Sequence, residues 1–290
     1  MKIPPPVDRH AAALAGIESQ MSAQARRLDE RSRRDRRFLV FAAVVVAALA
    51  VGLKSELIPP GSAWWFTAGL CATGALLVLA YLSAVTDSVR PGIEHYVPAV
   101  LGSLAVAGFS LILHDWRLYA LAAVAFAGGL AIAARLDYDR ITGRAKRGHV
   151  FLQEAVLAAA LLGAFIAVIT SPFSLSVRLA WIFVAGALAA FRSFRLGGEA
   201  ALQRALPPRR AILFSLLVAQ VLVFFAWAIW YYVAGISEGV FAAMLLLAWY
   251  INRGVIRHTA EETLSRHVVM EYGLVGVVLA LLFLVSYRPG

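Results

Sequence analysis

The sequence predicts an all-α integral membrane protein, a bundle of nine spans with the N-terminus in the cytoplasm and the C-terminus outside. Of its 290 residues, 61% are hydrophobic and 15% are charged, whereas soluble domains are about 25% charged. The apolar residues form continuous blocks close to the ~20 residues that a helix needs to cross a bilayer. They do not alternate with polar residues, as the strands of a membrane β-barrel would require.

The nine expected spans follow one another with short connections. They cover approximately 38–53, 63–85, 97–113, 118–134, 151–170, 179–194, 211–234, 240–251 and 268–287. The sixth and eighth have the shortest apolar cores. We expect them to cross the bilayer with help from Arg178, Arg192 and Arg253, whose long side chains would reach the headgroups, or from local thinning.

Basic residues set the orientation. With the N-terminus in the cytoplasm, 23 of the 27 Lys and Arg residues lie on the inner side, and only Lys54, Arg117, Arg178 and Arg288 lie outside. This distribution obeys the positive-inside rule. It predicts four helical hairpins closed on the outside, then a single ninth span, in a bacterial cytoplasmic (inner) membrane.

Residues 1–37 are expected to form a separate cytoplasmic segment, and residues 38–290 the transmembrane bundle. After "MKIPPP", an apolar stripe recurs at helical spacing along an otherwise charged stretch. The stripe consists of Leu14, Ile17, Met21, Ala25 and Leu28. Such a helix could lie on the anionic inner leaflet, pair with a partner helix, or simply lead into the first span.

Few polar residues fall within the spans, and each is a functional candidate because burying it in lipid is costly. Gln220 lies near the middle of the seventh span. It could contact a substrate or ion, or it could form an interhelical hydrogen bond. Gln153, Glu154, His267 and Glu271 lie at inner ends. They could line a polar vestibule, or they could be hydrated groups paired with neighbouring arginines.

The stretch "LDYDRITGRAKRGHV" (136–150) holds two aspartates and then several basic residues. It superficially resembles the acidic motif of UbiA-type prenyltransferases, but Asp137 and Asp139 are two residues apart and the companion acids are missing. We therefore interpret the stretch as a topology signal whose aspartates pair with its own arginines. The expected contacts for anionic lipid headgroups are Arg140, Arg144, Lys146, Arg147, Arg209 and Arg210.

No catalytic residue, cofactor or metal site is expected. Cys71 is the only cysteine, so neither a disulfide within the chain nor a Cys-based metal site is possible. The net charge of +10 could suggest nucleic acid, but the basic residues stand at span ends, as topology signals and lipid contacts do. Small residues four apart, such as Gly163 and Ala167, indicate close helix packing.

Two stretches, "FLQEAVLAAALLGAFIAVITSPFSLSVRLAWIFVAGALAAFRSFR" and "AWAIWYYVAGISEGVFAAMLLLAWY", loosely resemble an uncharacterised bacterial family of polytopic membrane proteins, a resemblance that implies no activity. The preferred function is a non-catalytic accessory or scaffold subunit that packs against other membrane subunits or itself. The alternative is a transporter, flippase or binder of an apolar or lipid-like substrate, with Trp227, Trp230 and Tyr231 on one face of its site. A lipid-phosphate or prenyl-transfer enzyme is a minor alternative.

Overall fold

The computed structural model describes residues 40, 42–44, 47, 63–85, 92–113, 115–141, 147–196, 206–233 and 235–286. The chain divides into two units, Met1–Phe41 and Ala42–Gly290, and the helices from residue 63 onward all belong to the second. Helices dominate the described residues, and no strand occurs among them. The protein is thus all-helical, with several apolar helices of the kind found in membrane proteins. The expected segment 1–37, and most of the expected first span, lie outside the described residues.

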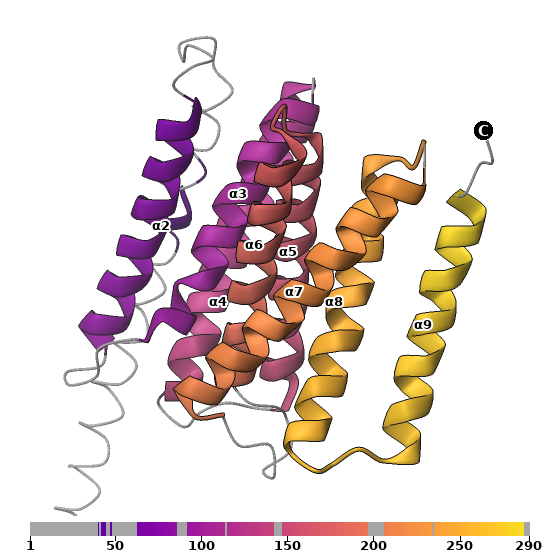
Figure 1. The fold of residues 1–290 in the computed structure, drawn as a ribbon. Coiled ribbons are helices and arrows are strands. Elements are labelled where there is room, and N and C mark those ends of the chain that lie inside the picture. The colour runs from indigo at the N-terminus through magenta and orange to yellow at the C-terminus, as the bar shows by residue number, and fades with distance from the viewer. Residues whose placement is uncertain are drawn as a thin grey trace, which may run out of the picture. The chain divides into compact units, whose positions relative to one another are not determined.

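Eight α-helices and one short 3-10 turn make up the described part of the bundle (Figure 1). They are α2 (Ala63–Val85), η2 (Ile93–His95), α3 (Val97–Ile112), α4 (Trp116–Ile141), α5 (Arg147–Thr170), α6 (Leu175–Leu196), α7 (Pro208–Tyr232), α8 (Glu238–Ala260) and α9 (Arg266–Ser286). Five of them, α4 to α8, are long and apolar enough to cross a membrane. Shorter apolar stretches occur at Ala68–Leu82 and Ile93–Phe109.

Three helices extend further than their apolar blocks predict. The expected sixth and eighth spans are helices of 22 and 23 residues, so neither is short for a bilayer. Arg192 and Arg253, which we expected to reach outward, are 1% and 8% exposed and point into the bundle. Helix α4 continues to Ile141, so Asp137 and Asp139 lie on a helix and not in a loop. Each of these helices continues beyond its apolar block because a charged side chain near its end is paired inside the bundle: Asp137 of α4 with Arg192 of α6, and Arg253 of α8 with Glu154.

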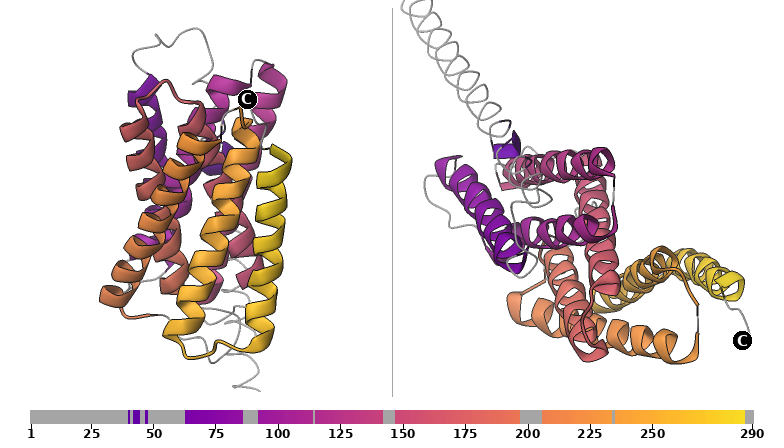
Figure 2. Two further views of the ribbon diagram at one scale, coloured as in Figure 1. Left: turned by 45° about the vertical axis from the view of Figure 1, so that its right-hand side comes forward. Right: turned by 90° about the horizontal axis from the view of Figure 1, so that it is seen from above.

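The helices pack most extensively in two pairs, α3 with α5 and α6 with α7. Helix α8 joins them through α5 and α7, while α2 packs on α3 at one edge and α9 packs on α8 at the other (Figures 1 and 2). The main hydrophobic core is built from α3 and α5 to α8. Glycines at two positions let helices α3 and α5 approach closely. A Cβ on Gly108 would collide with the backbone of Ala167, and one on Gly163 would collide with the side chain of Ala105.

Candidate functional site

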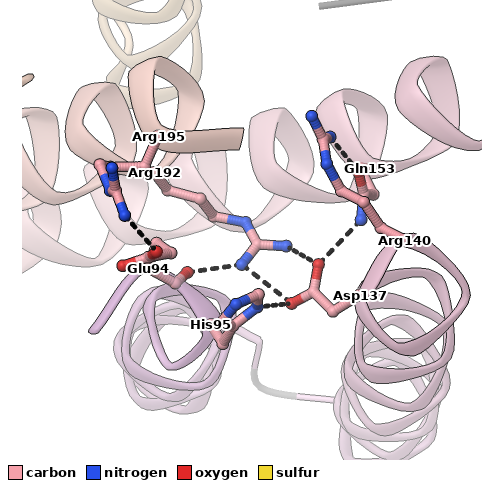
Figure 3. A network of polar contacts seen from close by, with 7 residues as sticks. All are labelled: Glu94, His95, Asp137, Arg140, Gln153, Arg192 and Arg195. Atoms are coloured by element: carbon pink, nitrogen blue, oxygen red, sulfur yellow. Dashed lines mark hydrogen bonds and ion pairs between the residues drawn. The ribbon is translucent and has the colours of Figure 1, made fainter. Parts of the chain in front are cut away.

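Polar and charged side chains meet at the end of the bundle where α3 and α5 begin and where α4, α6 and α8 end. We call this group the ionic cluster. It consists of Glu94, His95, Asp137, Arg140, Gln153, Glu154, Arg192, Ser193, Arg195 and Arg253. Figure 3 shows seven of these residues, which come from η2, α4, α5 and α6 and point toward one another.

The Asp137 carboxylate is the centre of the cluster. It is 1% exposed, and both of its oxygens accept hydrogen bonds from Arg192, at 2.9 Å to Oδ1 and 3.2 Å to Oδ2. Gln153 Nε2 donates to Oδ1 at 2.8 Å, and His95 Nδ1 lies 2.9 Å from Oδ2. A two-pronged pairing of guanidinium and carboxylate is the strongest form of this contact. Asp137 therefore ties α4 to α5, to α6 and to the turn before α3.

Arg192 and Arg195 connect α6 to the turn η2. Arg192, 1% exposed, donates from Nη1 to the backbone carbonyl of Glu94 at 2.5 Å. Arg195 Nη2 donates to the Glu94 carboxylate at 3.3 Å, and its Nη1 donates to the carbonyl of Leu206 at 3.1 Å. Both arginines stand at the end of α6, where unpaired backbone carbonyls favour positive charge. The short turn before α3 is thus held in place by two guanidinium groups.

A second group in the cluster joins α5, α6 and α8. Glu154 accepts a hydrogen bond from Ser193 Oγ at 2.8 Å and one from Arg253 Nη1 at 2.5 Å. Arg253 Nη1 also donates to Ser193 Oγ. The Arg253 guanidinium lies over the rings of Trp249 and Tyr250, 5.0 Å and 5.7 Å from their centroids. Such contacts stabilise a cation that has left water.

A small cavity of about 10 Å³ separates the two groups. It is lined by Arg140, Val150, Gln153, Glu154, Leu157, Arg192, Ser193 and Leu196. That volume is close to what one water molecule requires. The cavity therefore fits a single bridging water and not a substrate.

A larger and wholly different space lies between α3, α4 and α5. It is an apolar groove of about 470 Å³, which is within the ~300–1,000 Å³ range of small-molecule sites. Its lining residues are Pro98, Gly102, Ala105, Val106, Phe109, Ala122, Ala125, Phe126, Gly129, Leu130, Ala155, Val156, Ala159 and Ala160. None of these side chains is polar, so only hydrocarbon matches the surface of the groove.

The groove exists because α4 packs mainly on α3, and less on α5. Small residues on α4 and α5, including Ala125 and Ala159, leave the space between these two helices unfilled. Both alanines are exposed, so the groove is open on one side. A chain-like apolar molecule could enter it from the side of the bundle.

The polar residues singled out from the sequence lie on three helices, α5, α7 and α9. Gln153 and Glu154 belong to the ionic cluster. His267 and Glu271 are exposed on α9, where Glu271 accepts a hydrogen bond from Tyr250 at 2.7 Å. Tyr250 also lies under the guanidinium of Arg253, the partner of Glu154, so Glu271 borders the ionic cluster. The polar vestibule itself stays a prediction. Gln220 is exposed on α7 and does not line the groove.

The residues expected to contact lipid headgroups are also spread along the chain. Arg140 belongs to the ionic cluster, and Arg209 and Arg210 are exposed in the first turn of α7. Arg147 begins α5, and Arg144 and Lys146 lie outside the described residues. Their contact with lipid headgroups stays a prediction.

Asp137 does not pair with the arginines of its own stretch as expected, and for Asp139 that pairing stays a prediction. Among the described residues, Asp137 pairs with Arg192, which lies 55 residues further along the chain. Asp139 pairs with Arg135 at 3.5 Å and approaches His149 at 4.0 Å. The contacts that hold Asp137 leave neither of its oxygens free for an outside ligand. Within the described part of the chain, no group of three His, Cys, Asp or Glu residues could hold a metal ion.

Of the aromatic residues proposed for a substrate site, Trp227 and Tyr231 are exposed on α7, whereas Trp230 is partly buried against the core. Trp227 and Tyr231 are 39% and 71% exposed and stack on each other with their ring centroids 5.7 Å apart. Trp230 packs on Phe241 and under the guanidinium of Arg178. None of them lines the α3–α4–α5 groove.

Sequence reasoning did not detect the ionic cluster as a unit, although one signal was present. Asp137 follows Leu130 and Ala133 at helical spacing, which places it on the apolar face of α4 and thus toward the interior. Its partners stand on other helices, and no pattern along the chain connects them. The groove had no signal, because alanine fills a tight interface and lines an empty one equally well.

The chain matches no family model, no curated protein and no solved structure.

Proposed function

We propose that the protein is a nine-span protein of the bacterial inner membrane that binds the hydrocarbon chain of a lipid-like molecule in the α3–α4–α5 groove. Five long apolar helices and the strong bias of basic residues support the membrane placement. The observation that carries the binding role is the groove of about 470 Å³ with no polar side chain in its lining. Of the two main functions expected from the sequence, it favours the binder, transporter or flippase.

Burial of hydrocarbon explains why such a site needs no charge at the centre of the membrane. An acyl chain in the bilayer is already out of water, so its transfer into the groove has no hydrophobic driving force. Selectivity must therefore come from shape and close packing. The groove offers a floor of α3 residues that includes Gly102, with Phe126 on its α4 side. An accessory or scaffold role stays a prediction, because no contact among the described residues bears on it.

Photo-crosslinking tests the proposal. The full-length protein is placed in lipid nanodiscs with a phospholipid that carries a diazirine in its acyl chain, and the labelled peptides are mapped. We expect labelling of α3, α4 and α5 at the groove. The double variant Ala125→Leu/Ala159→Leu fills the groove from both walls and should remove this labelling.

A matched control uses two exposed alanines that do not line the groove, Ala180 in α6 and Ala280 in α9. The variant Ala180→Leu/Ala280→Leu adds the same apolar volume and should leave the labelling intact. Uniform labelling of all exposed helices, unchanged by the groove-filling variant, would contradict the proposed function.

A further inference from the structure

The groove and the ionic cluster are neighbours along three helices. Pro98, which lines the groove, follows His95 by three residues, and Ala155 follows Gln153 by two. On α4 the groove-lining residue Leu130 precedes Asp137 by seven residues, a distance on the order of 10 Å along a helix. The apolar groove therefore runs toward the polar end of the bundle and stops beside the cluster.

Arg140 continues the groove-lining stripe of α4. Ala122, Phe126, Gly129 and Leu130 recur at steps of three and four residues, and the same face passes through Ala133 and Asp137 to Arg140. A molecule that lies in the groove with its long axis parallel to α4 thus has Arg140 beyond its inner end. The spacing fits an amphiphile with an apolar tail and a polar head.

The charges of the cluster are not balanced at Arg140. Arg192 pairs with Asp137 at 2.9 Å, Arg195 with Glu94 at 3.3 Å, and Arg253 with Glu154 at 2.5 Å. Arg140 has no carboxylate partner among the described residues. Its one side-chain contact there is a hydrogen bond of 3.5 Å to the amide oxygen of Gln153, at the outer limit of such a bond.

We propose that the groove binds an anionic glycerophospholipid, with an acyl chain between α3, α4 and α5 and the headgroup phosphate on the guanidinium of Arg140. This inference rests on the proposed function and names the ligand class of the same site. A planar guanidinium with free N–H groups matches phosphate oxygens. The guanidinium groups of Arg192, Arg195 and Arg253 are paired with carboxylates, so they hold the helix ends in place. Arg140 is then the arginine of the cluster that can bind the headgroup phosphate.

The charge of the ligand is set by the same geometry. A zwitterionic headgroup would bring its own cation toward Arg140, whereas an anionic headgroup supplies the missing negative charge. A free anion gains nothing from the adjoining hydrocarbon surface, and an extended peptide would leave its backbone N–H and C=O groups without partners inside the apolar groove. An arginine with no carboxylate partner in the described part of the chain, beside an apolar groove, therefore favours a lipid as the ligand.

Competition between two photoactivatable lipids tests the headgroup assignment. Phosphatidylglycerol and phosphatidylcholine with identical diazirine-bearing chains are compared on the full-length protein in nanodiscs. We expect phosphatidylglycerol to label the groove more strongly. Replacing Arg140 with Gln should lower the phosphatidylglycerol signal roughly fivefold, since one basic residue near the membrane surface contributes about 1 kcal/mol to anionic-lipid binding. Phosphatidylcholine labelling should not change.

Two further variants sharpen the result. Arg266→Gln removes an exposed arginine at the start of α9 that does not line the groove and is not among the expected lipid contacts, so it should leave the preference for phosphatidylglycerol unchanged. Arg140→Lys keeps the charge and the contact with the cluster, so it should retain most of the preference even if Arg140→Gln lowers the yield of folded protein.

The possible outcomes separate this inference from the proposed function. If both lipids label the groove equally, or if Arg140→Gln and Arg266→Gln lower phosphatidylglycerol labelling to the same extent, the headgroup assignment is wrong while chain binding stands. If filling the groove with Leu at 125 and 159 changes the labelling by neither lipid, the proposed function itself is wrong.

Discussion

Replacing Asp137 with Asn should be among the most damaging single changes to the folded protein. Asp137 and Arg192 are each 1% exposed and are joined by two hydrogen bonds, at 2.9 and 3.2 Å. Asn has nearly the same shape, but it leaves the buried guanidinium without its counter-charge. Removing one partner of a buried ion pair costs about 3–5 kcal/mol. The amide nitrogen would also face donors on Gln153 or Arg192, so we expect the upper part of that range.

A double-mutant cycle isolates the pair. Arg192→Gln alone should also be costly, because it leaves the Asp137 carboxylate buried with only Gln153 and His95. The double variant Asp137→Asn/Arg192→Gln removes both charges, so it should cost clearly less than the sum of the two single changes. We expect a coupling of at least about 2 kcal/mol, well above the roughly 0.3–0.5 kcal/mol by which independent sites depart from additivity.

The measurement is reversible unfolding in mixed micelles with a rising fraction of denaturing detergent, followed by tryptophan fluorescence. Asp139→Asn is the matched control on the same helix. Its carboxylate is 14% exposed and pairs with Arg135, which is 30% exposed, so water can replace part of the lost contact and the cost should be smaller. Equal costs for the two Asn variants, or additive costs in the cycle, would refute the role given to Asp137.

Glycine packing and membrane topology give the remaining predictions. Gly108→Ala should destabilise the protein by about 1–3 kcal/mol through overpacking, because a Cβ there meets the backbone of Ala167. Gly128→Ala on α4, where a Cβ meets nothing within 4 Å, should stabilise it by about 0.5–1 kcal/mol in the same unfolding assay; the reverse order would show that α3 and α5 are not in close contact. For topology, single cysteines introduced at Gly235 and at Gly143 in a Cys71→Ser background should react with a membrane-impermeant maleimide from the outside at Gly235 only. Reaction at Gly143 in intact cells would reject the proposed orientation.

Helix positions were predictable from the sequence because each apolar block is a local property of the chain. The blocks expected from 63–85 onward all coincide with helices of the structure. The ends were less predictable. A helix end is set by where its last side chains find partners, and the partners of Arg192 and Arg253 lie 55 and 99 residues away, at Asp137 and Glu154.

The sequence by itself determined that this is a helical protein with membrane-spanning character, since composition and block length are sufficient for that conclusion. It also identified Gln153, Glu154 and Arg140 as polar residues at helix ends. Only the tertiary structure decided which charged groups are paired, and that Arg140 has no carboxylate partner among the described residues, because pairing depends on distances between helices. It likewise decided that the small residues of α4 and α5 border an open groove, since an alanine carries no information about whether another helix covers it.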